Sequence, residues 1–262
     1  MKNRTKLPNI YLAVLTVLMY LPIVVVVIYS FNESKQSYLW GGWTFNWYTE
    51  VFHDRSLIEA LKNSIILGIL SSGIAGIIGT LGAVGMVKSA LKSKDAIEYL
   101  SSLPIMIPEI ILGMVFMAFF SLLRLPFGMV TLVIGHASFC IPYVYMMVKA
   151  RLIGIDQSLI EAARDLGASG RRAFLDITLP LISPAIISGM LLSFAMSLDD
   201  VVISIFVTGA KTNTLPIKIY TQLKTGVTPK INALSTMMLL STLIIVVLSH
   251  LIGRRRKIRI GG

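Results

Sequence analysis

Long apolar runs alternate with polar segments along the whole chain, and each run approaches the length of a membrane-spanning helix. About 20 apolar residues suffice for a helix to cross a hydrocarbon core of about 30 Å. The pattern predicts six such helices, at residues 10–31, 61–87, 103–123, 130–148, 184–207 and 233–252. We therefore expect an all-α membrane protein with one transmembrane domain, residues 1–262, and long connections at residues 32–60, 149–183 and 208–232.

The composition and the first apolar run both favour a membrane protein. Hydrophobic residues make up 55% of the chain and charged residues only 14%, whereas about a quarter of the residues in soluble proteins are charged. Lys2, Arg4 and Lys6 precede the first run, as in a signal peptide. The run exceeds the usual core of about 7–15 residues, however, and no small-residue cleavage site follows it. We expect an uncleaved first helix.

The placement of the basic residues indicates the orientation. The net charge is +11, but the basic residues lie at the chain ends and in connections beside apolar runs. Nucleic-acid binding would require a basic soluble face, so we expect no nucleic-acid partner. Placing both termini in the cytoplasm leaves about two thirds of the 24 lysines and arginines in cytoplasmic segments, as the positive-inside rule requires. This arrangement predicts a multi-pass protein of the cell membrane, in contact with lipid, with residues 149–183 in the cytoplasm.

Small residues and prolines within the runs predict how the helices pack. Ser72, Gly76 and Thr80 repeat at a four-residue spacing, which lets membrane helices approach closely and suggests a central position for the second helix. Prolines remove a backbone donor and can kink a helix, either at an internal pathway or as ordinary packing kinks. Three of them lie within or near the third and fourth runs: Pro104, Pro108 and Pro142.

Motifs of self-contained catalysis are missing from the sequence. It contains no G-x-x-x-x-G-K-[ST] phosphate loop, no H-E-x-x-H zinc motif and no G-x-S-x-G nucleophile motif. We therefore expect neither an enzyme nor a cofactor or metal bound by this chain. His136 and the single cysteine, Cys140, lie within the fourth run, where we expect a hydrogen-bonded core histidine and an apolar packing residue.

Three acidic residues lie at membrane depth. Glu109 follows the start of the third run by six residues, about 9 Å from the inner boundary. Asp199 and Asp200 lie in the outer part of the fifth run. Carboxylates are costly in lipid, so they face a cavity, a partner or a permeant charge. They are candidates for a cation pathway, although bonding to backbone amides at a helix break or to a neighbouring subunit remains the alternative.

The cytoplasmic segment 156–180 predicts two short helices separated by a glycine. Ser158 and Glu161 have the spacing of a capping box, and Asp156 is a competing N-cap. Gly167 suits a left-handed helix stop. A second helix is expected from Gly170, capped by Ser169, to about Ile177, with Leu179-Pro180 ending it and Ser183-Pro184 starting the fifth membrane helix. The first helix would dock in a groove of a partner or lie at the membrane interface.

Two outer connections carry further signals. Residues 216–224, which begin with a proline, predict a short interfacial helix. Connection 32–60 contains Trp40, Trp43, Trp47 and Tyr48. Such aromatic residues favour the membrane–water interface and could equally contact a partner.

Residues 161–180 carry a family resemblance. Glu161-Ala-Ala-Arg-Asp-Leu-Gly167 through Ile177-Thr-Leu-Pro180 resembles the EAA loop of binding-protein-dependent ABC importer permeases. The likeness extends over nearly the whole chain to spermidine/putrescine-type permeases, as the second permease subunit of the importer. It is carried by residues 191–202, 206–209, 214–220 and 226–233, and by 107–110, where Glu109 stands in place of an expected aspartate.

The resemblance implies a six-helix type I importer permease of the MetI-like fold, working by alternating access. It implies a second homologous permease subunit, two ATP-binding subunits that hold ATP and magnesium, and an extracytoplasmic substrate-binding protein. Glu109, Asp199 and Asp200 would meet the ammonium groups of a polyamine. The residues implied in coupling to the ATPase are Glu161, Ala162, Ala163, Gly167, Ile177, Leu179 and Pro180. The alternatives are another solute carried by the same importer class and a stand-alone secondary transporter, which would leave the EAA-like loop unexplained.

Overall fold

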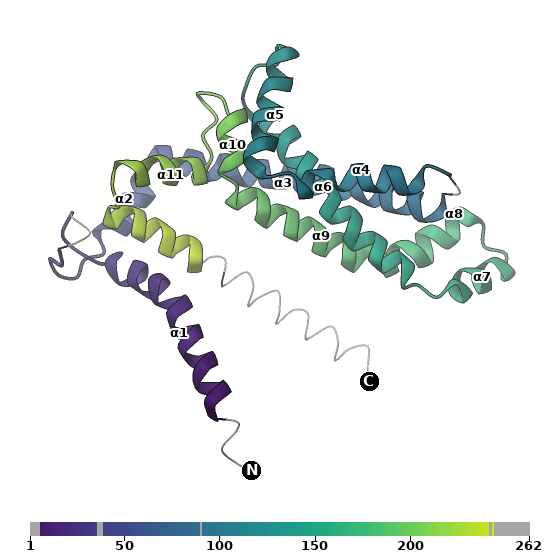
Figure 1. Cartoon of the computed structure of the whole chain (residues 1–262), viewed down its shortest axis with the longest axis horizontal. Helices are drawn as coiled ribbons and strands as arrows, with labels where there is room; N and C mark the ends of the chain where they lie inside the picture. Colours follow the sequence, from purple (N-terminus) through teal and green to yellow (C-terminus); the bar gives the residue numbers. More distant parts are fainter. Residues whose placement is uncertain (1–5, 36–38, 90, 241–242, 244–262) are drawn as a thin grey trace. The chain divides into compact units, whose positions relative to one another are not determined.

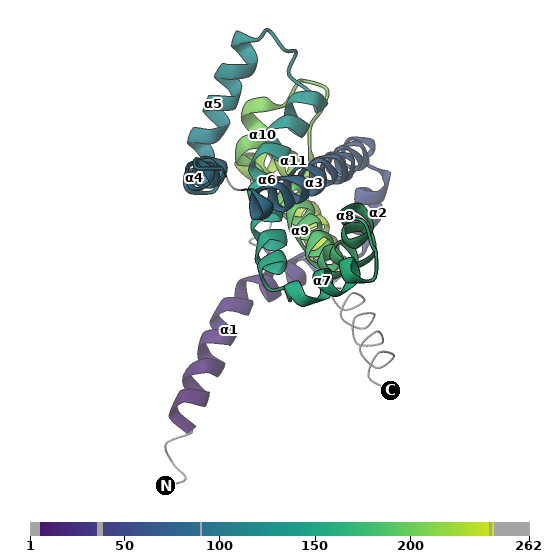
Figure 2. The ribbon, with the colours of Figure 1, turned by 90° about the vertical axis from the view of Figure 1, so that its right-hand side faces the viewer.

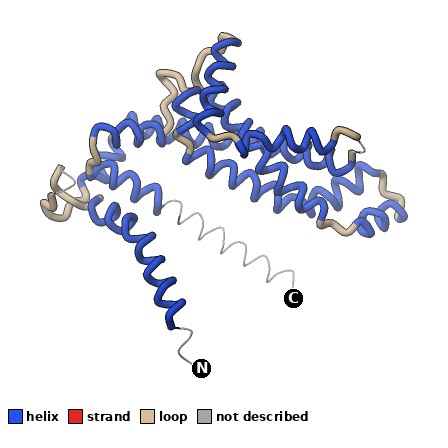
Figure 3. Tube along the Cα trace, viewed as in Figure 1, coloured by secondary structure: helices blue, strands red, loops and turns tan. Residues whose placement is uncertain are grey.

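The computed structural model describes residues 6–35, 39–89, 91–240 and 243, which form helices joined by loops (Figures 1 and 3). Two compact units are distinguished. One comprises residues 59–218, and the other comprises residues 1–58 with 219–262. The helices are α1 Lys6–Tyr29, α2 Asn46–His53, α3 Arg55–Lys88, α4 Lys94–Met106, α5 Glu109–Leu122, α6 Met129–Ile153, α7 Gln157–Asp165, α8 Gly170–Ala173, α9 Leu179–Asp199, α10 Val202–Val207 and α11 Leu215–Thr225. Residues 229–240 are also helical.

Five of the six predicted spans have helical counterparts. Four helices are long and apolar enough to cross a membrane: Pro8–Tyr29, Arg55–Val87, Met129–Ile153 and Gly170–Asp199. The pair α4 and α5 meets the same criteria when it is counted as one broken span. The sixth predicted span, residues 233–252, lies in large part outside the described residues, and its first residues, 233–240, are helical. The short helix predicted at residues 216–224 is confirmed as α11.

The span predicted at residues 103–123 is broken at Pro108, one of the prolines expected to distort a helix there. The chain breaks at Ile107-Pro108, and α4 and α5 meet at an angle of 105°; Figure 2 views α4 nearly end-on, with α5 rising away from it. Ile107 is extended, with φ −79° and ψ 131°, the conformation that a following proline favours. Pro104 and Pro142, in contrast, lie within helices α4 and α6.

The predicted boundaries of the fifth helix are also wrong at both ends. A π-helical turn, Phe174–Thr178, joins α8 to α9 without a break. The Leu179 N–H bonds the Phe174 carbonyl five residues back, so the helix continues past Pro180. Pro184 cannot bond the Pro180 carbonyl, which accepts from the Ser183 hydroxyl at 2.9 Å instead. Toward its end, the run is interrupted at Asp200 and resumes as α10.

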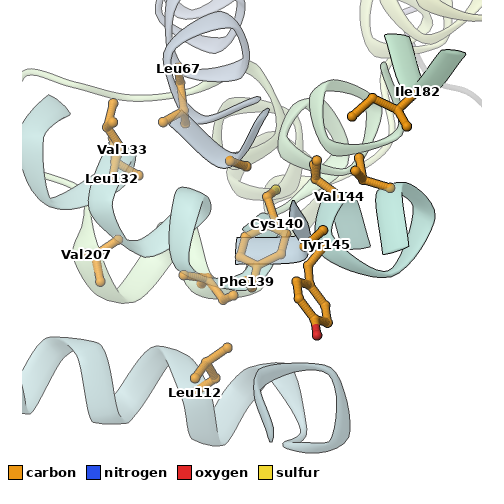
Figure 4. Packing of buried hydrophobic residues seen from close by; sticks show 14 of the residues in the cluster. Leu67, Leu112, Leu132, Val133, Phe139, Cys140, Val144, Tyr145, Ile182 and Val207 are labelled. Atoms are coloured by element: carbon orange, nitrogen blue, oxygen red, sulfur yellow. The ribbon is translucent and has the colours of Figure 1, made fainter. Parts of the chain in front are cut away.

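The core of residues 59–218 is built around α6 and α9, which run side by side (Figure 1). Apolar side chains from α3, α5, α6, α9 and α10 meet in one cluster (Figure 4). Its labelled members are Leu67, Leu112, Leu132, Val133, Phe139, Cys140, Val144, Tyr145, Ile182 and Val207. Cys140 is fully buried there, which confirms its predicted packing role.

Glycines on α3 allow this helix to pack closely, as the sequence predicted. A Cβ at Gly76 would meet Met190 of α9 at 2.7 Å. At Gly79, a Cβ would lie 2.9 Å from the Val144 Cβ and 3.0 Å from the Ile141 carbonyl oxygen, both on α6. At Gly79 the close atoms include the backbone of α6, which cannot rotate away as a side chain can. The central packing of α3 therefore depends on Gly79 in particular.

Gly79→Ala is expected to lower the thermal midpoint of the purified protein by several degrees, because α3 and α6 must separate to admit the methyl group. Gly73→Ala is the matched control on the same helix, since nothing lies within 4 Å of its Cβ position. Alanine is favoured over glycine within a helix by about 1 kcal/mol, so the control should be neutral or stabilising. Equal midpoints for the two variants would contradict close packing at Gly79.

The connection at residues 32–60 contains more structure than the sequence predicted. Helix α2 occupies residues 46–53, and α3 begins at Arg55, six residues before the predicted start. Trp47 donates from Nε1 to the Asn32 carbonyl at 2.7 Å, and the Tyr48 hydroxyl bonds Ser30 Oγ at 2.6 Å. Trp40 and Trp43 pack edge to face, with ring centroids 5.0 Å apart, and are exposed. Trp47 and Tyr48 therefore stabilise the loop through hydrogen bonds, whereas Trp40 and Trp43 are exposed.

Asp54 joins the start of α3 to the first turn of the helix at residues 229–240. Its carboxylate accepts from Lys230 Nζ at 2.7 Å and from the amides of Ser56 and Leu57. The Lys230 hydrogen bond is the largest cause that lowers the pKa of Asp54 from 3.8 to about 2. The ionised carboxylate is therefore the form that stabilises this unit.

Asp54→Asn is expected to lower the thermal midpoint at neutral pH and to have little effect in acid. Because the folded pKa lies below the unfolded one, the stability that Asp54 contributes is complete above about pH 4 and is lost as the pH falls toward 2. Thermal unfolding measured across this pH range in detergent checks the expectation. Glu50→Gln, an exposed change on α2, is the control. A pH-independent difference between Asp54→Asn and the parent would contradict it.

Candidate functional site

The three acidic residues predicted at membrane depth lie around one pocket. The pocket has a volume of about 340 Å³ and is lined by Glu109, Phe139, Met196, Asp199, Asp200, Val201 and Val202. These residues come from the start of α5, the middle of α6 and the junction of α9 with α10. Volumes of about 300–1,000 Å³ are typical of small-molecule sites. The structure thus brings together carboxylates that are some 90 residues apart in the chain.

The predicted depth of Glu109, about 9 Å from the inner boundary, does not fit its place beside Asp199. The cause is the start of α4, which begins at Lys94 and not at Leu103. Helix α4 has 13 residues, which at about 1.5 Å per residue give it a length of about 20 Å before the bend. Glu109 is then the first residue of α5, directly after the break at Pro108.

Asp199 and Asp200 have different surroundings. Asp200 Oδ1 accepts the Ile203 N–H at 3.2 Å, and Oδ2 accepts the Ser204 N–H at 2.8 Å, so this carboxylate caps α10. Its side chain is only 6% exposed. Asp199 and Glu109 are exposed to the pocket, and neither carboxylate has a hydrogen-bond or ion-pair partner within the described part of the chain. The alternative of backbone bonding at a helix break therefore holds for Asp200.

His136 connects α6 to this break. Its Nδ1 lies 2.8 Å from Ser197 Oγ, and its Nε2 lies 2.9 Å from Ser204 Oγ and 3.3 Å from Asp200 Oδ2. The side chain is fully buried. These contacts confirm the prediction of a hydrogen-bonded core histidine. Its link to Asp200 was not predicted, because no local pattern relates residues so far apart in the chain.

The predicted glycine stop between two helices is confirmed in segment 156–180. Gly167 has φ +86°, and its N–H bonds the Arg164 carbonyl at 2.9 Å. The Ala168 N–H bonds the Ala163 carbonyl at 3.0 Å. These two bonds form a Schellman motif, which ends a helix and requires a left-handed residue after it. Glycine alone adopts this conformation without steric cost.

The caps of the two helices follow one prediction and correct another. Helix α7 begins after Asp156, whose carboxylate accepts the Ser158 N–H at 3.0 Å; this bond lowers the pKa of Asp156. Asp156 is therefore the cap, and the capping box of Ser158 with Glu161 does not form, because Ser158 already lies inside the helix. Ser169 caps the second helix as predicted, accepting the Arg172 N–H at 3.4 Å.

The predicted coupling residues differ in exposure. Glu161, Ala162, Gly167 and Pro180 are exposed, and Ala163, Ile177 and Leu179 are partly buried. Leu179 packs against the core cluster. Next to Gly167, Leu166 is 90% exposed. The segment thus presents an apolar side chain at a rigid turn and continues directly into the long helix that ends at Asp199.

One ion pair was missed by sequence reasoning. Glu98 on α4 accepts from the Tyr145 hydroxyl at 2.8 Å and from Lys149 Nζ at 2.5 Å, both on α6. The partners are 47 and 51 residues apart, so no short-range spacing marks them. The contact joins α4 to α6.

Comparison with known proteins identifies related chains. The family model described as "Binding-protein-dependent transport system inner membrane component" matches residues 75–258. The spermidine/putrescine transport system permease protein PotC of Haemophilus influenzae is 38% identical, covering 97% of this chain and 98% of that protein. The putrescine transport system permease protein PotI of Escherichia coli is also 38% identical, covering 84% of this chain and 81% of that protein.

Solved structures support the fold. A chain of a bacterial ABC transporter involved in the import of the acidic polysaccharide alginate superposes with a TM-score of 0.72. The superposition covers 95% of this chain and 98% of the transporter chain, at 16% sequence identity. The likeness is therefore one of fold. With the family model matched over most of its length, this chain belongs to the inner membrane components of binding-protein-dependent transport systems.

Proposed function

We propose that this chain is a permease subunit of an ATP-driven importer that carries polyamines such as spermidine and putrescine across the cell membrane. The observation that carries the proposal is the pocket in which Glu109 and Asp199 present two carboxylates that have no partner among the residues the structure describes. Ionisable residues at membrane depth are expected to face a permeant charge. The names of the relatives, which are permeases of spermidine and putrescine systems, support the same cargo.

Two separated carboxylates suit a linear cation with an ammonium group at each end. A single ion pair at 4 Å contributes about 4 kcal/mol near a protein surface, where the effective dielectric constant is about 20. Two such pairs offset much of the cost of removing a dication from water, and the exposed position of both carboxylates allows the cargo to leave. Asp200 adds negative charge nearby, but its oxygens are occupied by the amides of α10.

The proposal assigns the energy source to partner subunits. In it, segment 156–180 binds a groove on an ATP-binding subunit through α7 and the exposed Leu166. ATP and magnesium are held by two copies of that subunit, a second homologous permease completes the pathway, and an extracytoplasmic binding protein delivers the cargo. Both termini then lie in the cytoplasm. The helix that runs from Gly170 to Asp199 joins the docking segment to the pocket, so movement at one end is transmitted to the other.

The first test is gentle purification of the tagged chain from its native membranes, with identification of the proteins that accompany it. A second permease and an ATP-binding subunit should co-purify, and the reconstituted complex should take up radiolabelled putrescine or spermidine only with ATP. A chain that elutes alone and transports in ATP-free vesicles under an ion gradient would be a secondary transporter. A co-purifying complex that takes up neither polyamine would support the importer class but refute polyamines as its cargo.

A further inference from the structure

A buried polar network crosses the break between α9 and α10. His136, on α6, contacts Ser197 of α9 through Nδ1 and Ser204 of α10 through Nε2. Its Nε2 also lies 3.3 Å from Asp200 Oδ2. The Ser71 hydroxyl of α3 lies 3.2 Å from Ser197 Oγ. One imidazole thus contacts both sides of the break.

The contacts of Asp200 determine which nitrogen of His136 carries a proton. An ionised carboxylate can only accept hydrogen bonds, so the Nε2 that faces Asp200 is the protonated one. Nδ1 is then turned toward the Ser197 hydroxyl. Together with the Ile203 and Ser204 amides, the imidazole gives both oxygens of the Asp200 carboxylate partners within the protein. Asp200 is therefore unsuited to release its partners for a passing cation.

The position of α10 affects both free carboxylates of the pocket. Asp199 is the last residue of α9, directly before the break. Helix α10 packs along α5, and a Cβ at Gly113 of α5 would lie 2.5 Å from the Phe206 ring of α10. Gly113 is one turn from Glu109, the first residue of α5. A displacement of α10 would therefore move Glu109 and redirect Asp199.

We propose that His136 is a positioning residue for cargo selection. By holding Asp200 on the first amides of α10, it fixes the break and so the separation of the carboxylates of Glu109 and Asp199. That separation determines which spacing of ammonium groups the pocket accepts. The inference rests on the proposed function, since it concerns how the same pocket chooses among linear diamines.

A series of linear diamines with three to six methylene groups tests which spacing of ammonium groups the pocket prefers. The complete importer, with its binding protein, is reconstituted in vesicles, and KM and kcat for ATP-driven uptake are determined for each diamine. The selectivity of the binding protein affects every variant equally, so it cancels in the ratio of variant to parent. In His136→Leu, which removes all three contacts, kcat/KM for the preferred diamine should fall at least about tenfold, equivalent to 1.4 kcal/mol. The preference among chain lengths should also become flatter.

Two further variants separate positioning from folding. His136→Gln keeps an amide donor able to reach Asp200, and it should restore part of the length preference. Ser138→Ala, on the same helix, removes only a bond to the Ile134 carbonyl within α6 and should match the parent. If His136→Leu fails to assemble, Ser204→Ala, which removes one neighbour of the imidazole, takes its place in the series.

The outcomes distinguish this inference from the proposed function. A length profile that keeps the parental shape in an assembled His136→Leu or Ser204→Ala importer would overturn the positioning role, even if total uptake falls. If the unmodified importer takes up neither spermidine nor any of the diamines, the proposal that it carries polyamines is refuted. A flattened profile that His136→Gln partly restores would establish His136 as the residue that sets the carboxylate spacing.

Discussion

Gly167→Val is expected to abolish ATP-driven uptake while the protein still inserts and remains folded. Gly167 has φ +86°, a conformation that costs an L-residue about 1–2 kcal/mol and a β-branched one more. The chain would relieve this strain by opening the Schellman bonds to Arg164 and Ala163. The exposed Leu166 would then turn away from its present direction. ATP-driven uptake, measured in vesicles, should fall to background, while ATP hydrolysis should no longer respond to the cargo.

Two substitutions test whether backbone conformation is the cause. Gly167→Asn should retain most of the uptake, because asparagine tolerates the left-handed region. Gly154→Ala changes the glycine at the other end of the same connection, where φ is −84° and an added Cβ meets only ordinary contacts at 3.7 Å. It should behave as the parent. Full uptake by Gly167→Val, or equal losses of uptake in the valine and asparagine variants, would show that transport does not depend on the left-handed conformation of Gly167.

The parts of the fold predicted from the sequence are those decided by local composition. Helices α1, α3 and α6 follow from the length of their apolar runs, and Gly167 follows from the conformational freedom of glycine. The three prolines show where local rules stop. Pro104 and Pro142 remain inside helices and Pro108 bends the chain by 105°. All three lack the same backbone donor, so this local property does not tell which proline becomes the break.

The sequence predicted which acidic residues belong to the candidate site, but not how their side chains are arranged. Sequence reasoning identified Glu109, Asp199 and Asp200 because carboxylates are rare within apolar runs. It could not assign their roles, which depend on His136 and on the amides of α10. The hydrogen bond between His136 and Ser197 spans 61 residues of the chain, and nothing in the spacing of the two residues indicates it. The cap at Asp156 was undecided for a related reason, since aspartate and serine cap helices about equally well.

Segment 156–180 and the acidic pocket lie at the two ends of one helical path, which runs from Gly170 through the π-helical turn to Asp199. A π-helical turn has one residue more than an α-helical turn of the same rise, and such turns often mark functional sites. Here it carries the chain past Pro180 with the backbone bond of Leu179 preserved. The path is thus continuous from the EAA-like residues to the acid that borders the pocket. This continuity explains why a change at Gly167 should alter transport at a distance.

Removing the charge of Glu109 or of Asp199 is expected to lower polyamine uptake about 10- to 100-fold without loss of the assembled protein. Each carboxylate faces the pocket and has no partner in the described chain, so Glu109→Gln and Asp199→Asn remove nothing that the fold uses. A hydrogen bond to a charged group contributes about 1.5–3 kcal/mol, which corresponds to this range. The double variant should be inactive. Uptake competition and thermal unfolding, measured on the same preparations, separate transport from stability.

Asp200→Asn is expected to behave in the opposite way and therefore completes the test. Its carboxylate caps α10 through the Ile203 and Ser204 amides and contacts His136. An asparagine keeps one acceptor for α10 but turns its amide donor toward the other donors, and a buried donor left without an acceptor costs about 1–3 kcal/mol. The thermal midpoint should fall for Asp200→Asn and stay unchanged for Asp199→Asn. If Asp199→Asn destabilises the protein while Asp200→Asn leaves it intact, the two neighbouring acids have the reverse roles, and the pocket must be reassigned.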